Sequence, residues 1–70
     1  MKLKKGDRVR DIFGMAVGTV TFVYTSGSNG TDYARVKYPN KVFHDGLDEY
    51  VNAQSAFVKI TEEDYFIGCL

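Results

Sequence analysis

The sequence predicts an all-β fold, a small barrel of five or six antiparallel strands. Apolar and polar residues alternate along most of the 70 residues, which is typical of strands that bury one face. Seven glycines interrupt this alternation at short intervals, and five tyrosines and five phenylalanines favour twisted strands over helices. Short strands between frequent turns indicate a barrel rather than an extended open sheet.

The first half of the chain predicts three strands. We expect the first two at residues 8–12 and 18–24, joined by a short connection that Gly14 and Gly18 bracket. Alternation would place Val20, Phe22 and Tyr24 on one face of the second strand. The segment 25–30, TSGSNG, is a turn cluster that would close a hairpin onto a third strand at 32–38.

The second half predicts a further hairpin and a closing strand. An Asp-Gly step at 45–46 lies between two short runs, which is a strong hairpin signal. Residues 52–56 read as one 3₁₀ turn, and residues 57–60 as the closing strand. Thr61 precedes Asp64 by three residues, an arrangement that resembles a helix capping box. We therefore divide the chain into a barrel, 1–60, and a tail, 61–70, that forms a short helix.

The expected core follows from the alternation. It would hold apolar residues from every strand together with one or two tyrosines. These residues are Val9, Ile12, Val20, Phe22, Ala34, Val36, Leu47, Phe57 and Ile60.

Size and charge limit the function. A chain this short buries only about 60% of its unfolded surface, which leaves little room for a deep active site. The formal net charge is zero, although residues 1–44 are basic and residues 45–70 acidic; strong nucleic-acid binders are usually basic overall. Cys69 is the only cysteine, so neither a disulfide within the chain nor a cysteine-rich metal site is expected. We expect a cytoplasmic protein without cofactor, metal or membrane association.

Residues 6–20, GDRVRDIFGMAVGTV, resemble the first hairpin of SH3-like barrels of the KOW and Tudor type. In that family a Gly-Asp-x-Val start leads through a Gly-x-x-x-Gly-x-Val turn into a second strand. The segments YARVKYPN and EYVNAQSAFVKI resemble its third and closing strands. The resemblance covers about residues 5–60 and implies an SH3-like barrel, a fold that serves many functions.

Plasmid-encoded type II dihydrofolate reductases are distantly similar through GDRVR and the closing strand. Their shared pore is lined by a Val-Gln-Ile-Tyr segment, where this chain has Glu49, Tyr50, Val51 and Asn52. The ligand-contacting glutamine and tyrosine are therefore missing, and we expect no enzymatic activity.

A basic sheet face is the first candidate binding site. Arg8, Arg10, Tyr33, Arg35 and Lys37 would share the outward face of three neighbouring strands, beside Thr19 and Thr21. Cations that neutralise phosphates and an aromatic ring for stacking are what a nucleic-acid surface needs. The same residues are also the ordinary solvent side of an antiparallel sheet. The basic arm of Lys2, Lys4 and Lys5 has the same two interpretations.

The tail is the second candidate site. Tyr65, Phe66, Ile67 and Leu70 follow the last strand, so they either cover an open end of the barrel or dock on a partner. Glu62, Glu63 and Asp64 could complement the basic face within one chain or between two copies.

Three further groups carry weaker signals. His44 and Asp45 are neighbours and would point to opposite faces, which does not make a catalytic dyad. Asp45, Asp48 and Glu49 lack EF-hand spacing. Four rings could form a Tudor-like cage around a cation or simply pack: Tyr33, Tyr38, Phe43 and Tyr50.

We therefore expect a non-enzymatic binding module that docks onto another protein, as an accessory or inhibitor protein of a phage or other mobile element. The sequence leaves open whether the protein forms a homo-oligomer. The alternative is a KOW-like nucleic-acid-binding protein that uses the basic face.

Overall fold

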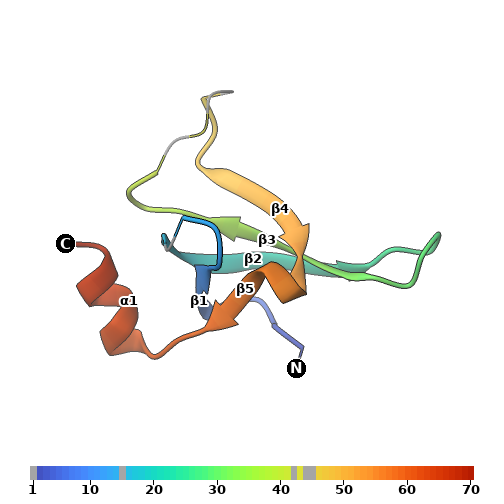
Figure 1. Cartoon of the computed structure of the whole chain (residues 1–70), viewed down its shortest axis with the longest axis horizontal. Helices are drawn as coiled ribbons and strands as arrows, with labels where there is room; N and C mark the ends of the chain where they lie inside the picture. Colours follow the sequence, from blue (N-terminus) through green and yellow to red (C-terminus); the bar gives the residue numbers. More distant parts are fainter. Residues whose placement is uncertain (1, 15, 42, 44–45) are drawn as a thin grey trace.

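The computed structural model describes residues 2–14, 16–41, 43 and 46–70 and confirms an all-β fold on one antiparallel sheet. The sheet has the strand order β4-β3-β2-β1-β5 (Figure 1). The strands are β1 (Arg8–Asp11), β2 (Val17–Thr25), β3 (Asp32–Lys37), β4 (Glu49–Ala53) and β5 (Phe57–Lys59). A 3₁₀ turn, η1 (Gln54–Ala56), precedes β5, and a helix, α1 (Glu62–Gly68), follows it.

The expected barrel does not close. Strands β4 and β5 form the two edges of the sheet, and they do not pair with each other in the described part of the chain. Figure 1 shows the β2–β3 hairpin extending beyond the other strands, with α1 at the opposite end of the sheet. The prediction of an all-β fold with five antiparallel strands is thus confirmed, and the prediction of closure is wrong.

The core lies on the inner face of the curled sheet. Val9, Val20, Ala34 and Val36 are fully buried there, as expected from the alternation in β1, β2 and β3. The core cluster also contains Leu3 and Ala56, which the expected core did not include, and Tyr38, which is one of its expected tyrosines. They cover the core from the N-terminal segment, the end of β3 and η1, so the chain's turns contribute to its packing.

Three residues expected in the core are instead exposed. Phe22 is 53% exposed because a β-bulge shifts the pairing of β2 with β3 between Val20 and Phe22. The extra residue reverses the alternation, so Phe22 and Tyr24 face outward while Val23 packs against the core. Ile12 and Leu47, 53% and 59% exposed, lie outside the strands, where alternation no longer decides the face. Ile60 is only half-buried.

The hairpin expected around 45–46 is described in part, since Val42, His44 and Asp45 lie outside the described residues. Gly46 has a φ of 84°, a left-handed conformation that glycine adopts without strain. Its N–H donates to the Phe43 carbonyl at 2.8 Å, and the Phe43 N–H donates to the Leu47 carbonyl at 2.8 Å. These bonds form a turn that leads into β4, which pairs with β3.

Helix α1 confirms the helical tail. Thr61 is its N-cap, and the Thr61 hydroxyl accepts a hydrogen bond from the Asp64 N–H at 3.1 Å. Three acidic residues occupy the first turn, where they complement the positive end of the helix dipole. Among the described residues, no helix has the length and apolar character needed to cross a bilayer.

Gly18 lies where β2 packs tightly against the end of β3. A Cβ at this position would lie 2.5 Å from Val36 Cγ1 and 2.7 Å from the Lys37 carbonyl oxygen. We expect Gly18→Ala to lower the free energy of unfolding by about 1 to 3 kcal/mol, because the core cannot accept the extra atom without moving. Chemical denaturation measures this change.

Gly27→Ala is the matched control, because nothing lies within 4 Å of a Cβ at Gly27. Its free energy of unfolding should stay within about 0.5 kcal/mol of the wild type. Equal effects of the two substitutions would show that the close approach at Gly18 does not constrain the sheet.

Candidate binding surfaces

The strand register brings much of the predicted basic face together. Arg8 in β1 is opposite Thr19 in β2, and Thr19 is opposite Lys37 in β3. Arg35 is two residues from Lys37 on the same outward face of β3. Arg10 lies two residues beyond Arg8 on β1, where it is opposite Val17 rather than Thr19. We name Arg8, Thr19 and Lys37 the cationic row.

The Arg8 side chain is bound by two residues of helix α1. The Arg8 Nε donates to Glu62 Oε1 at 2.9 Å, and its guanidinium lies 3.9 Å from the centroid of the Tyr65 ring. A second guanidinium nitrogen donates to the Thr19 hydroxyl. The hydrogen bond from Arg8 to Glu62 raises the pKa of the guanidinium. Arg8 is therefore held by an acid and an aromatic ring of its own chain.

Lysines of the described residues also have acidic partners within the chain. Lys37 Nζ lies 3.9 Å from Asp48 Oδ2, at the other end of the cationic row. The nearest nitrogen–oxygen distances in the pairs Lys2–Asp32 and Lys59–Asp7 are 3.8 and 3.7 Å. Within the predicted basic face, the acidic partners of Arg8 and Lys37 make the sheet surface less positive than its sequence predicts.

The tail divides into a buried and an exposed part. Tyr65 is buried, and its ring forms one wall of a groove of about 240 Å³ beside the sheet. Gly68 fits closely against β2, since a Cβ there would lie 2.5 Å from Val17 Cγ1. Three predicted partner-binding residues are exposed: Phe66, Ile67 and Leu70. The other residues that line the groove are Thr19, Thr21, Lys37 and Pro39.

An aromatic patch covers the outward face beyond the cationic row. The rings of Phe22 and Tyr24 have centroids 5.9 Å apart, and those of Tyr24 and Tyr33 stack at 5.3 Å. The Arg35 guanidinium lies 6.0 Å from the Phe22 ring, and Arg35 is opposite Val51 of β4. We define the aromatic patch as Phe22, Tyr24, Tyr33, Arg35 and Val51.

Sequence reasoning missed most of this patch. It placed Phe22 in the core, assigned Arg35 to a nucleic-acid surface, and assigned Tyr33 to that surface or to an aromatic cage. The bulge that turns Phe22 outward has no clear mark in the sequence.

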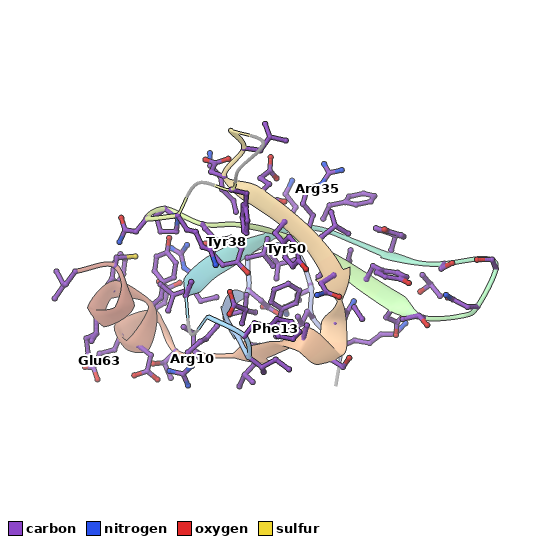
Figure 2. All side chains as sticks on the ribbon, turned by 45° about the horizontal axis from the view of Figure 1, so that its top comes forward. Arg10, Phe13, Arg35, Tyr38, Tyr50 and Glu63 are labelled. Carbon is purple, nitrogen blue, oxygen red and sulfur yellow. The ribbon has the colours of Figure 1, made fainter. Side chains whose placement is uncertain are left out.

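A second aromatic group lies at the open side of the sheet, between the end of β1 and β4. It contains three of the four rings of the predicted cage, whereas Tyr33 lies in the aromatic patch. Phe43 meets Tyr38 edge-on at 5.5 Å and stacks on Tyr50 at 5.2 Å. Figure 2 shows Tyr38, Tyr50 and Phe13 on one side of β4 and Arg35 on the other. These rings border a cavity of about 210 Å³, which we name the seam cavity. Its lining residues are Asp11, Phe13, Tyr38, Lys41, Phe43 and Tyr50.

The seam cavity already holds a cation of the chain itself. The Lys41 ammonium lies 5.2 Å from the centroid of the Phe43 ring and 5.9 Å from that of Tyr38. The Asp11 carboxylate at the cavity wall is buried and accepts hydrogen bonds from the backbone N–H groups of Phe13 and Gly14. The charges around these rings are thus balanced within the chain.

The Tyr38 hydroxyl is the unusual polar group of this cavity. Tyr38 is 1% exposed, and its hydroxyl has no hydrogen-bond partner of acceptable geometry among the described residues. Burial raises the pKa of the phenol, and the Asp11 carboxylate raises it further. The neutral phenol is the form that the fold favours.

The described acidic residues of the weak cation-site signal, Asp48 and Glu49, have partners within the chain. Asp48 pairs with Lys37, and Glu49 Oε1 accepts a hydrogen bond from the Thr21 hydroxyl at 3.1 Å. Asp45 and His44 lie outside the described residues. The turn at 25–30 forms the expected hairpin loop, closed by the Ser26 N–H donating to the Thr31 carbonyl at 2.8 Å.

Comparison with known proteins found no match. No family model fits the chain, no curated protein sequence is significantly similar to it, and no solved structure superimposes significantly on it.

Helix α1 should separate from the sheet when its close contact is lost. We expect Gly68→Ala to lower the hydrogen-exchange protection of the α1 amides about tenfold, because the added methyl group cannot fit against Val17. Ile67→Ala is the control, since Ile67 is exposed on the same helix. A Gly68→Ala variant with wild-type protection would contradict the docking described here.

Tyr38 should make the fold sensitive to alkali. Because the folded pKa is raised, its stabilising contribution is complete below the unfolded pKa of about 10 and is lost as pH rises through the folded value. Denaturation curves recorded between neutral pH and pH values above about 10 measure this loss.

The Tyr38→Phe variant should lose this dependence on pH. At neutral pH its free energy of unfolding should match the wild type or exceed it by up to about 1 kcal/mol, because an unsatisfied buried hydroxyl is removed. A large loss of stability at neutral pH would show that the hydroxyl has a strong partner.

Proposed function

We propose that this chain is a non-enzymatic module that docks onto another protein through the aromatic patch. The observation that carries the proposal is the continuous group of outward-facing Phe22, Tyr24 and Tyr33 beside Arg35. Phe22 and Tyr24 are 53% and 42% exposed and their rings adjoin each other, and a contiguous exposed apolar patch is typical of an interaction site. Tyrosine, phenylalanine and arginine are the residues enriched at the centres of protein interfaces.

The charge distribution favours a protein over a nucleic acid. Phosphate binding needs several cations that are free to release counterions. In the cationic row, Arg8 is bound by Glu62 and Lys37 lies beside Asp48. Arg35 is the one cation of the aromatic patch, and no carboxylate of a described residue lies within ion-pair distance of it. One cation among rings is typical of an interface anchor.

A nucleic-acid-binding function is the second candidate. The exposed rings of Phe22 and Tyr24 favour it, because every base can stack on an aromatic side chain. In that function Arg35 and Lys37 would contact phosphates. Arg8 would join them only after Glu62 had released it.

Three finer parts of the proposal rest on the sequence. These are the relationship to SH3-like barrels of the KOW and Tudor type, a cytoplasmic location, and the role of accessory or inhibitor protein of a mobile element. The exposed Phe66, Ile67 and Leu70 of the tail provide a second apolar surface for a partner.

Capture from a host lysate by the immobilised protein tests the docking function. We expect the wild type to retain a specific partner and Phe22→Ser to lose it by at least tenfold, because truncating a central aromatic anchor costs about 2 kcal/mol or more. Quantitative mass spectrometry of the eluates measures the ratio.

Val58→Ser is the matched control, since Val58 is 48% exposed on β5, the strand furthest from β4 in the sheet. It should retain the partner as the wild type does. Equal retention by Phe22→Ser and Val58→Ser would exclude the aromatic patch as the docking surface.

A further inference from the structure

Strand β4 is an edge strand with little of the usual protection. Natural edge strands are kept from pairing with other chains by charged side chains, especially lysine, by proline, by a bulge or by very short length. Strand β4 has five residues, EYVNA, with one charged side chain, Glu49, and neither proline nor lysine, and it pairs with β3 in a continuous register. Strand β5, the other edge, has three residues and ends at Lys59. The two edges of the same sheet thus differ in how open they are to another strand.

The free side of β4 lies between two exposed apolar regions. Val51 is 40% exposed on the outward face, where it belongs to the aromatic patch. Tyr50 is 38% exposed on the opposite face, where it lines the seam cavity. In the described part of the chain only β3 pairs with β4, so the other side of β4 is open to a further strand. One donor on that side is in use, because the Ala53 N–H donates to Asn52 Oδ1 at 2.7 Å, and a further strand would have to replace this bond.

The sequence of β4 is complementary to itself around Val51. Antiparallel pairing of two copies at this centre places Glu49 opposite Ala53 and Tyr50 opposite Asn52. The only charged residue of the strand then faces a neutral one, whereas pairing centred on Glu49 would oppose two carboxylates. Within one chain the Asn52 side-chain amide already donates to the Tyr50 hydroxyl at 3.1 Å, and the same two groups would meet across the pair.

We propose that two copies of this chain associate through β4, antiparallel around Val51, into a two-fold symmetric dimer with one continuous sheet. Such an interface is isologous, because the same strand of each copy provides it. Five paired residues form an interface smaller than the roughly 1,200 Å² of a standard stable one, so we expect a weak dimer that forms only as the protein concentration rises. Because Val51 is part of the aromatic patch, the dimer joins the two patches into one surface. The inference stands on the free edge of β4 and does not depend on the proposed docking function.

Analytical ultracentrifugation tests the dimer over about 5 to 500 μM protein, the range expected for a small interface. We expect the wild type to change from monomer to dimer over this range and Val51→Lys to stay monomeric. Val58→Lys, the same exchange on the exposed face of β5, should dimerise like the wild type. A wild type that is monomeric throughout, or a Val51→Lys variant that dimerises normally, would overturn the proposal.

Hydrogen exchange of the wild type provides a readout that does not depend on any variant. The amides of β4 should gain protection as the protein concentration rises, while those of β5 should not. Phe22→Ser separates this interface from the aromatic patch, because it leaves the β4 backbone intact. Loss of the dimer in Phe22→Ser together with unchanged exchange in β4 would place the contact on the patch and contradict strand pairing.

Discussion

The contact between Arg8 and helix α1 determines the charge of one end of the outward face. Arg8 reaches from β1 to the Glu62 carboxylate and stacks on Tyr65, and the close fit of Gly68 against Val17 supports the same arrangement. An exposed ion pair by itself contributes little to stability. Combined with a buried ring, it places an acidic helix over one end of a basic sheet. The tail therefore acts as part of the sheet surface rather than as a free appendage.

This arrangement separates the face into two parts. The end beneath α1 is polar, and its Arg8 and Lys37 have acidic partners; Thr19 and Lys37 lie beside the groove that Tyr65 borders. The other end has exposed rings and the guanidinium of Arg35. A surface with paired charges at one end and aromatic anchors at the other is suited to docking on a protein, because affinity then comes from apolar burial.

The sequence predicted the strands well because alternation and turn residues are local signals. The capping of α1 by Thr61 and the burial of Val9, Val20 and Val36 follow directly from such signals. The position of Phe22 could not be predicted, since a single bulged residue reverses every later side chain of β2. The pairing of Arg8 with Glu62 joins residues 54 positions apart and depends on how the last strand directs the helix. From the sequence we expected the acids of the tail to complement the basic face, but could not predict whether they do so within one chain or between two copies.

Fluorescence anisotropy with labelled single- and double-stranded oligonucleotides tests most directly whether the ion pairs of Arg8 and Lys37 keep this face from binding nucleic acid. The titrations run from low to physiological salt. We expect no salt-sensitive binding by the wild type at micromolar protein, because the cationic row is paired with its own acids. Micromolar binding that weakens steeply with salt, and that Arg35→Glu removes, would contradict a protein-docking face and assign it to nucleic acid.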